Sequence, residues 1–148
     1  MLEAEVKRIN ILMADDDEDD RLLTQDALEE SRVINNLYFV NDGVELLAYL
    51  NNQAPFEDKQ KYPRPNIILL DLNMPRMDGR EALKLIKENT ALRSIPVVIL
   101  TTSKQEEDKL RGYDLGAASY ITKPVTFEGL VELMKQLGKY WIEIVELP

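Results

Sequence analysis

Short apolar runs alternate with amphipathic stretches along this chain of 148 residues. Five runs have the length and the Ile, Val and Leu content of buried strands, at 9–14, 37–40, 66–70, 97–101 and 119–122. Near-continuous apolar runs are typical of parallel strands, which helices cover on both faces. The pattern therefore predicts an α/β fold built from five strand–helix pairs.

Polar residues mark where three helices should begin. In a capping box, a short polar side chain accepts a hydrogen bond from the third following amide, and a Glu at that position reaches back. This spacing occurs for Asp42 with Glu45, Asp78 with Glu81, and Ser103 with Glu106. We therefore expect helices near 43–52, 79–89 and 104–115.

Apolar periodicity predicts a first and a last helix. The first should begin just after the acidic run 15–20 and turn four residues inward: Leu22, Leu23, Ala27 and Leu28. The last should be long and end near Val145, because apolar residues recur about every 3.6 positions across Gly138. These residues are Phe127, Leu130, Val131, Met134, Leu137, Trp141, Ile144 and Val145.

The segment 53–65 interrupts this rhythm. It contains three prolines and no apolar repeat, so it predicts an extended loop between the second helix and the third strand.

Composition narrows the chemistry. With 45% apolar residues, the chain can bury about 70% of the surface that its unfolded form exposes, which predicts one domain over 1–148. The chain has neither Cys nor His, which excludes disulfides, thiolate metal sites and Ser-His-Asp triads. The net charge of -9 argues against nucleic acid as the main partner and favours a cation or a basic protein patch.

No signal for a membrane or for export stands out. The apolar run Ile9–Ala14 near the start is short, is interrupted by Asn10 and leads into acidic residues. We expect a cytoplasmic protein without a membrane partner.

Polar side chains follow the carboxyl ends of the predicted strands, which is where parallel α/β sheets bind ligands. The first strand leads to 15–17, three consecutive Asp residues; the third leads to Asp71, the fourth ends in Thr101, and the fifth leads to Lys123. If the first strand lies between the second and the third, these side chains meet in one crevice. The same residues also have purely structural interpretations. Lys123 would be a surface lysine, Thr101 a β-branched strand residue, and the acids at 15–17 the start of a helix.

The carboxylates predict a metal ion. Asp71 directly follows Ile-Ile-Leu-Leu, where an unpaired charge is costly, and gathered carboxylates repel one another unless a cation is present. Oxygen ligands without His or Cys favour Mg²⁺, with Mn²⁺ or Ca²⁺ as substitutes. The ligands would be Asp16, Asp71 and the backbone carbonyl of Asn73, with Asp15 close by.

These groups together favour phosphoryl transfer to a carboxylate. Lys123 is held between a strand end and Pro124, and its ammonium can reach toward Asp71 to neutralise an anion carried there. Thr101 offers a hydroxyl donor at the same crevice. Asp71 is the acceptor that we would choose, because it alone directly follows a four-residue aliphatic run.

Four motifs in this order and spacing resemble a two-component response-regulator receiver domain. They are Ala-Asp-Asp-Asp at 14–17, Leu-Leu-Asp-Leu-Asn-Met-Pro-Arg-Met-Asp-Gly at 69–79, Leu-Thr-Thr-Ser at 100–103 and Tyr-Ile-Thr-Lys-Pro at 120–124. The resemblance covers about Lys7 to Leu137, which places the core of the domain at about 7–137. It implies a doubly wound, flavodoxin-like sheet of order 2-1-3-4-5 with five helices, the last one extended.

The resemblance also implies the role of each motif residue. Asp71 would be the phosphoacceptor, Asp15 and Asp16 the acidic pair that binds Mg²⁺, and Lys123 the phosphate-contacting lysine. Thr101 and Tyr120 would be the switch residues, and the Lys123–Pro124 bond would be cis. Such a protein accepts a phosphoryl group from a histidine kinase or phosphotransfer protein and remodels the face of its fourth helix, fifth strand and fifth helix. It catalyses only its own phosphorylation and dephosphorylation, so it is not an enzyme in the usual sense.

The inserted loop 53–65 and the C-terminal extension 138–148 are similar to those of small single-domain bacterial regulators that partner phytochrome-type histidine kinases. Their purely local interpretation is a surface loop and a helix that covers its own apolar stripe. An unidentified downstream protein target and a homodimer, formed through the switch face or the aromatic tail, are further expectations.

Three other functions fit parts of the sequence. A magnesium-dependent phosphatase with an aspartyl nucleophile would use two acids with the spacing of Asp15 and Asp17, but it leaves Asp71 without a role. A flavodoxin-like FMN carrier shares the topology, but the acids at 15–20 would repel its phosphate. A receiver that only docks partners would have no need for the complete site.

Overall fold

The computed structural model describes residues 9–32, 35–113 and 115–140. Its elements in chain order are β1 (Ile9–Ala14), α1 (Glu18–Ser31), β2 (Asn35–Val40), α2 (Gly43–Leu50), β3 (Ile67–Asp71), α3 (Gly79–Glu88), β4 (Val97–Thr101), α4 (Lys104–Arg111), β5 (Ser119–Thr122) and α5 (Phe127–Tyr140). The strands are all parallel and lie in the order β2-β1-β3-β4-β5. The predicted fold class and strand order are confirmed.

Three strands, β1, β4 and β5, have the predicted bounds. The strand β2 begins earlier than predicted, at Asn35, because polar asparagines continue its pairing with β1: the Asn36 side chain donates to Asn10 Oδ1 at 3.1 Å. The strand β3 lies one residue later than predicted and includes Asp71, which pairs with Leu100 of β4. The phosphoacceptor candidate is therefore held by the sheet itself.

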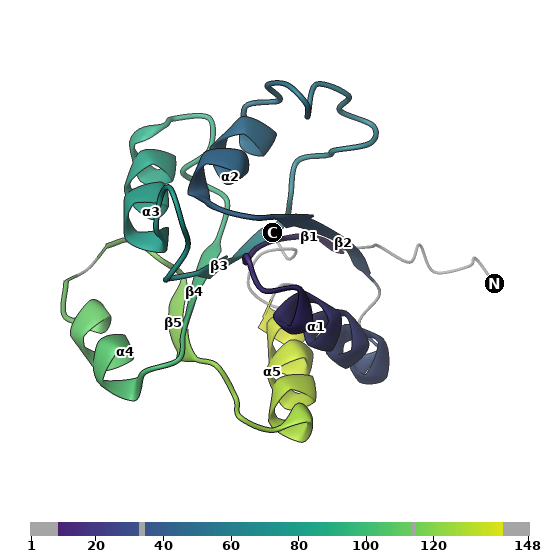
Figure 1. Cartoon of the computed structure of the whole chain (residues 1–148), viewed down its shortest axis with the longest axis vertical. Coiled ribbons are helices and arrows are strands. Elements are labelled where there is room, and N and C mark those ends of the chain that lie inside the picture. The colour runs from purple at the N-terminus through teal and green to yellow at the C-terminus, as the bar shows by residue number, and fades with distance from the viewer. Residues whose placement is uncertain (1–8, 33–34, 114, 141–148) are drawn as a thin grey trace.

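Helices cover both faces of the sheet (Figure 1): α1 and α5 lie on one side, and α2, α3 and α4 on the other. Successive side chains of a strand point to opposite faces. In β3, Ile68 and Leu70 pack toward α2 and α3, while Ile67 and Leu69 pack toward α1 and α5. Because helices cover both faces of the sheet, side chains that bind a ligand can be presented at the carboxyl ends of its strands.

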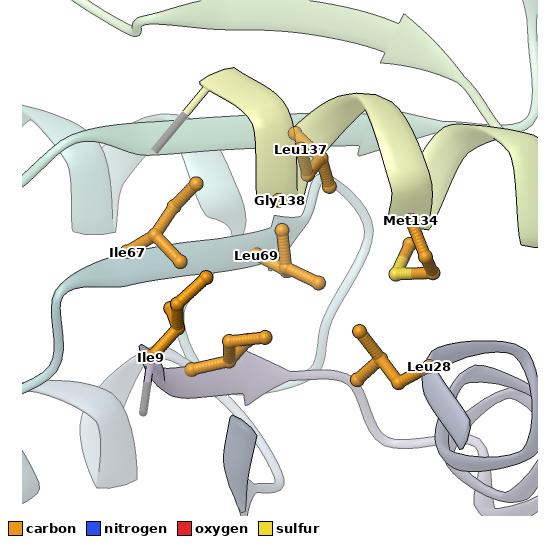
Figure 2. Close-up of a pocket in the computed structure, with 8 residues that line it drawn as sticks. Ile9, Leu28, Ile67, Leu69, Met134, Leu137 and Gly138 are labelled. Atoms are coloured by element: carbon orange, nitrogen blue, oxygen red, sulfur yellow. The ribbon is translucent and has the colours of Figure 1, made fainter. Parts of the chain in front are cut away.

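The core beneath α1 and α5 is closely packed. Figure 2 shows Leu28 of α1 and Met134 and Leu137 of α5 around a pocket above β1 and β3. The pocket is apolar and measures about 10 Å³, which is at the lower limit for one water molecule. This pocket is a packing feature and not a ligand site.

The first helix differs from its prediction in two respects. It begins at Glu18, inside the acidic run, because Asp17 caps it by accepting a hydrogen bond from the Asp19 amide. Leu22 and Leu23 are 59% and 46% exposed, so the prediction that they point inward was wrong. The buried stripe is formed instead by Thr24, Ala27 and Leu28, since a threonine occupies an inward position.

The three predicted helix caps are confirmed. The side chains of Asp42, Asp78 and Ser103 accept hydrogen bonds from the amides of Glu45, Glu81 and Glu106. The helix α4 ends at Arg111, earlier than predicted, and Gly112 forms its C-cap.

The last helix is long, as predicted, but its predicted end near Val145 lies outside the described residues. Phe127 is 39% exposed because it lies at the start of the helix, and Leu133 is buried in the core instead. None of the helices in the described part of the chain is both long and apolar enough to cross a membrane.

The loop 53–65 contains no helix or strand, as predicted, and aromatic side chains hold it against α2. The Tyr49 ring lies 5.4 Å from that of Phe56 and 5.7 Å from that of Tyr62, and the Tyr49 hydroxyl donates to Pro63 O at 2.9 Å. Ala54–Pro55 is the one cis peptide bond among the described residues. The expectation of a cis Lys123–Pro124 bond was therefore wrong, and Lys123 contacts Asp71 with this bond in the trans form that X–Pro pairs usually prefer.

Candidate functional site

Four strand ends form the candidate site at the carboxyl edge of the sheet. β1 lies between β2 and β3, which was the condition for the predicted side chains to meet. Asp15 follows β1 and is fixed by its amide, which donates to Val40 O of β2 at 3.1 Å. Lys123 follows β5 and is fixed by its amide, which donates to Thr101 O of β4 at 2.7 Å.

Three of the predicted metal ligands lie together. Asp15, Asp16 and Asp71 each offer a carboxylate oxygen, and these oxygens lie within 4.8 Å of one another. Asp15 is fully buried and Asp71 nearly so, while Asp16 is exposed. An all-oxygen donor set with one open side fits a divalent cation that keeps part of its water shell, such as Mg²⁺.

Lys123 joins this cluster through three ion pairs. Its Nζ lies 3.3 Å from Asp15 Oδ2, 3.3 Å from Asp71 Oδ1 and 2.8 Å from Asp20 Oδ2. Burial alone would lower the pKa of the ammonium, but the three carboxylates outweigh burial and raise that pKa. Lys123 is therefore charged in the folded protein and faces the phosphoacceptor candidate.

Burial disfavours the charged forms of two of these carboxyl groups, those of Asp15 and Asp71. Burial raises the pKa of Asp15 to about 6, although the Asp17 amide and Lys123 oppose the shift. Burial also raises the pKa of Asp71, against the opposing effect of Lys123. A bound dication would restore the charged forms, which is a second reason why these residues suit a metal.

The remaining predicted residues occupy different positions around the cluster. Asn73 is exposed in the loop 72–78, two residues after Asp71. Thr101 is fully buried, and its hydroxyl donates to Glu106 Oε1 at 2.7 Å. Tyr120 is buried in β5, and its hydroxyl oxygen accepts a hydrogen bond from the Ala117 amide at 3.4 Å.

The roles of Asp20 and Glu106 were not predicted from the sequence. Asp20 was interpreted only as a solvated acid at a helix start, yet it makes the shortest contact with Lys123. No sequence pattern indicated this contact, because Asp20 belongs to α1 and the direction of its side chain depends on how that helix packs. Glu106 was assigned only to the capping box of Ser103, and no sequence pattern indicated its contact with Thr101.

The acid spacing that suggested a phosphatase has a structural explanation. Asp17 caps α1, and its amide donates to Asp15 Oδ1 at 2.9 Å. The carboxylate of Asp17 is therefore committed to the helix and exposed, while Asp71 faces Lys123. This arrangement disfavours Asp15 and Asp17 as a catalytic pair.

Comparison with known proteins gives a family match over most of the chain. The family model described as the response regulator receiver domain matches residues 11–135. The chain is 41% identical to the response regulator Rcp1 of Synechocystis sp., and the match covers 93% of this chain and 92% of that protein.

Solved structures agree with this match. The structure of the phosphorylated cyanobacterial phytochrome response regulator RcpA is 38% identical, with a TM-score of 0.82, and the match covers 96% of this chain and 99% of that one. The Mn²⁺-bound form of Rcp1 is 40% identical, with a TM-score of 0.79, and the match covers 95% of this chain and 99% of that one.

Proposed function

The chain belongs to the response regulator receiver family, and on that premise we propose that Asp71 accepts a phosphoryl group from a phosphohistidine in a Mg²⁺-dependent reaction. The observation that carries this proposal is the position of Lys123, whose ammonium contacts Asp71 within a cluster of metal-ligating acids. Only a buried carboxylate with a fixed cation beside it and a dication site around it combines an acceptor with the means to neutralise its product.

The proposed reaction is an in-line displacement. A carboxylate oxygen of Asp71 forms a bond to phosphorus, and the bond between phosphorus and the donor's imidazole nitrogen breaks. The electron pair of that bond stays on the imidazole, which takes up a proton. Lys123 donates hydrogen bonds to the phosphoryl oxygens, and β3 holds Asp71 in place during the attack.

The metal site would be formed by Asp15, Asp16, Asp71 and the backbone carbonyl of Asn73. When bound, Mg²⁺ supplies positive charge against the phosphoryl oxygens, and Mn²⁺ or Ca²⁺ would substitute for it. The burial of Asp15 and the Mn²⁺-bound structure of the related Rcp1 support this assignment.

The proposed donor is a histidine kinase or phosphotransfer protein. Similarity to RcpA, a cyanobacterial phytochrome response regulator, supports a phytochrome-type kinase. The proposed output is a protein-binding or self-associating surface formed by α4, β5 and α5, with Thr101 and Tyr120 coupling it to phosphorylation.

Intact-mass analysis after incubation with Mg²⁺ and acetyl phosphate tests the proposal. We expect the wild type to gain one phosphate, EDTA to prevent the gain, and Asp71→Asn to abolish it. An unchanged mass of the wild type would favour a receiver that only docks partners.

A turnover assay separates the phosphatase alternative. In excess phosphate monoester, we expect a receiver to release no more than about one phosphate per chain. An aspartyl phosphatase would release phosphate continuously. Continuous release that survives Asp71→Asn would overturn the assignment of Asp71.

A further inference from the structure

The Thr101 hydroxyl already has a partner for its single proton. It donates its proton to Glu106 Oε1 at 2.7 Å and accepts from the Ser103 amide at 3.2 Å. A hydroxyl has one proton to donate, and Thr101 is fully buried, so water does not compete for it. Any other acceptor for this proton has to displace Glu106.

The Glu106 carboxylate contacts the end of β4 and does not make the usual capping-box hydrogen bond to a backbone amide before the helix. In the capping box at the start of α2, the Glu45 carboxylate reaches back and accepts from the Asn41 amide at 2.8 Å. At the start of α4, the Glu106 amide donates to Ser103 Oγ, but its carboxylate accepts from Thr101 instead. A hydroxyl bound to a carboxylate at this distance is a strong, charge-assisted hydrogen bond.

The next residue holds the same helix to β5 independently. Glu107 is buried and accepts hydrogen bonds from the amide and hydroxyl of Thr122, at 2.6 and 2.8 Å. Arg111 adds a bond to Tyr120 O at 2.5 Å. Loss of the contact between Glu106 and Thr101 would therefore free the Glu106 side chain from the end of β4, while Glu107 still holds α4 to β5.

We propose that Glu106 is a positioning residue that holds the Thr101 hydroxyl and competes with a phosphoryl group on Asp71 for its proton. This inference rests on the proposed function of Asp71 and Thr101. In the unphosphorylated protein Glu106 ties the first turn of α4 to the end of β4. Phosphorylation breaks this tie, so Glu106 sets the cost of switching.

The test measures the affinity for beryllofluoride, a phosphoryl mimic, by calorimetry in the presence of saturating Mg²⁺. We expect Glu106→Gln to bind it roughly fivefold to tenfold more tightly, because a neutral amide holds the hydroxyl less strongly than a carboxylate. Glu106→Asp keeps the charge but is one methylene shorter, so it should also bind more tightly. The matched control is Glu81→Gln, which changes the same position in the capping box of α3, where the side chain is exposed, and should leave the affinity unchanged.

A double-mutant cycle separates the hydrogen bond from a general effect of charge. In a Thr101→Ala background, Glu106→Gln should have no effect on beryllofluoride affinity, because no hydroxyl remains to be released. An equal gain with and without the hydroxyl, or no gain for either Glu106 variant, would overturn the role of Glu106. If the wild type takes up phosphate on Asp71 and both Glu106 variants bind beryllofluoride with the wild-type affinity, only this inference is refuted. If the wild type takes up neither phosphate nor beryllofluoride, the proposed function is refuted.

Discussion

The Lys123 ammonium forms ion pairs with three carboxylates, those of Asp15, Asp20 and Asp71. In Lys123→Met we expect Mg²⁺ to bind roughly tenfold more tightly, because a fixed positive charge no longer repels the dication. Phosphorylation by acetyl phosphate should nevertheless slow by about 100-fold or more, because the phosphoryl oxygens lose a donor. Calorimetry and a mass-based time course measure these two opposite effects.

The matched control for this variant is Lys135→Met, which removes an exposed lysine of α5 and should change neither quantity. Equal Mg²⁺ affinities in Lys123→Met and the wild type would contradict the position of the ammonium beside the metal site. A normal rate of phosphorylation would contradict its role in the reaction.

The site could be predicted from sequence where a residue directly follows a strand. Asp71 and Lys123 were predictable because parallel strands deliver such residues to one edge. Asp20 and Glu106 belong to helices, where the direction of a side chain depends on how the helix packs. Their contacts with Lys123 and Thr101 are set by tertiary structure, and no local pattern encodes them.

Gly79 lets α3 approach the backbone of the phosphoacceptor. A Cβ at this position would lie 2.7 Å from Asp71 O and 3.0 Å from Leu72 Cα, and neither backbone atom can yield cheaply. We expect Gly79→Ala to lower the free energy of unfolding by about 1–3 kcal/mol and to slow phosphorylation of Asp71. Urea denaturation and the mass-based time course measure the two effects.

Gly112 provides the control for this variant. A Cβ there would lie 3.4 Å from Lys109 O, an ordinary contact, and its φ of -75° suits any residue. Gly112→Ala should therefore keep the stability and the phosphorylation rate of the wild type. A loss of stability at Gly112 equal to that at Gly79 would show that close approach is not the cause.

Glu107 makes the attachment of α4 to β5 dependent on pH. Burial alone would raise its pKa, but hydrogen bonds from Lys104, Thr122 and Arg111 lower it to about 2, from 4.5 in the unfolded chain. The charged form therefore contributes stability that is fully present above pH 4.5 and is lost as the pH falls through about 2. We expect Glu107→Gln to lower the free energy of unfolding by up to about 3 kcal/mol at pH 7.

Urea denaturation at a series of pH values tests this dependence. The difference between the wild type and Glu107→Gln should shrink as the pH falls from about 4.5 toward 2, because the wild-type carboxylate then takes up a proton. Glu132→Gln, an exposed change on α5, is the control and should show little difference at any pH. A difference that is independent of pH would mean that the charge of Glu107 does not hold the helix.

Helix starts were easier to predict than helix faces. The caps Asp42, Asp78 and Ser103 act through local hydrogen bonds, which depend only on spacing along the chain. Leu22 and Leu23 were placed inward wrongly because apolarity does not identify the buried stripe when a threonine shares it. Their exposure follows from the packing of α1 against the sheet and α5, which one helix does not specify.

Binding of Mg²⁺ should stabilise the entire fold, because its proposed ligands follow β1 and lie at the end of β3, two adjacent strands of the sheet. A ligand that binds only the folded state adds about 2.7 kcal/mol to the free energy of unfolding at 100 times its Kd. We expect this gain in the wild type and its loss in Asp16→Asn, whose exposed side chain can be changed without disturbing the metal-free fold. Asp26→Asn removes an exposed acid from α1 and should keep the full gain, as measured by urea denaturation at constant ionic strength with Mg²⁺ or EDTA. If Asp16→Asn kept the gain as well, Mg²⁺ would be stabilising the protein by screening its negative charge and not by occupying the strand ends.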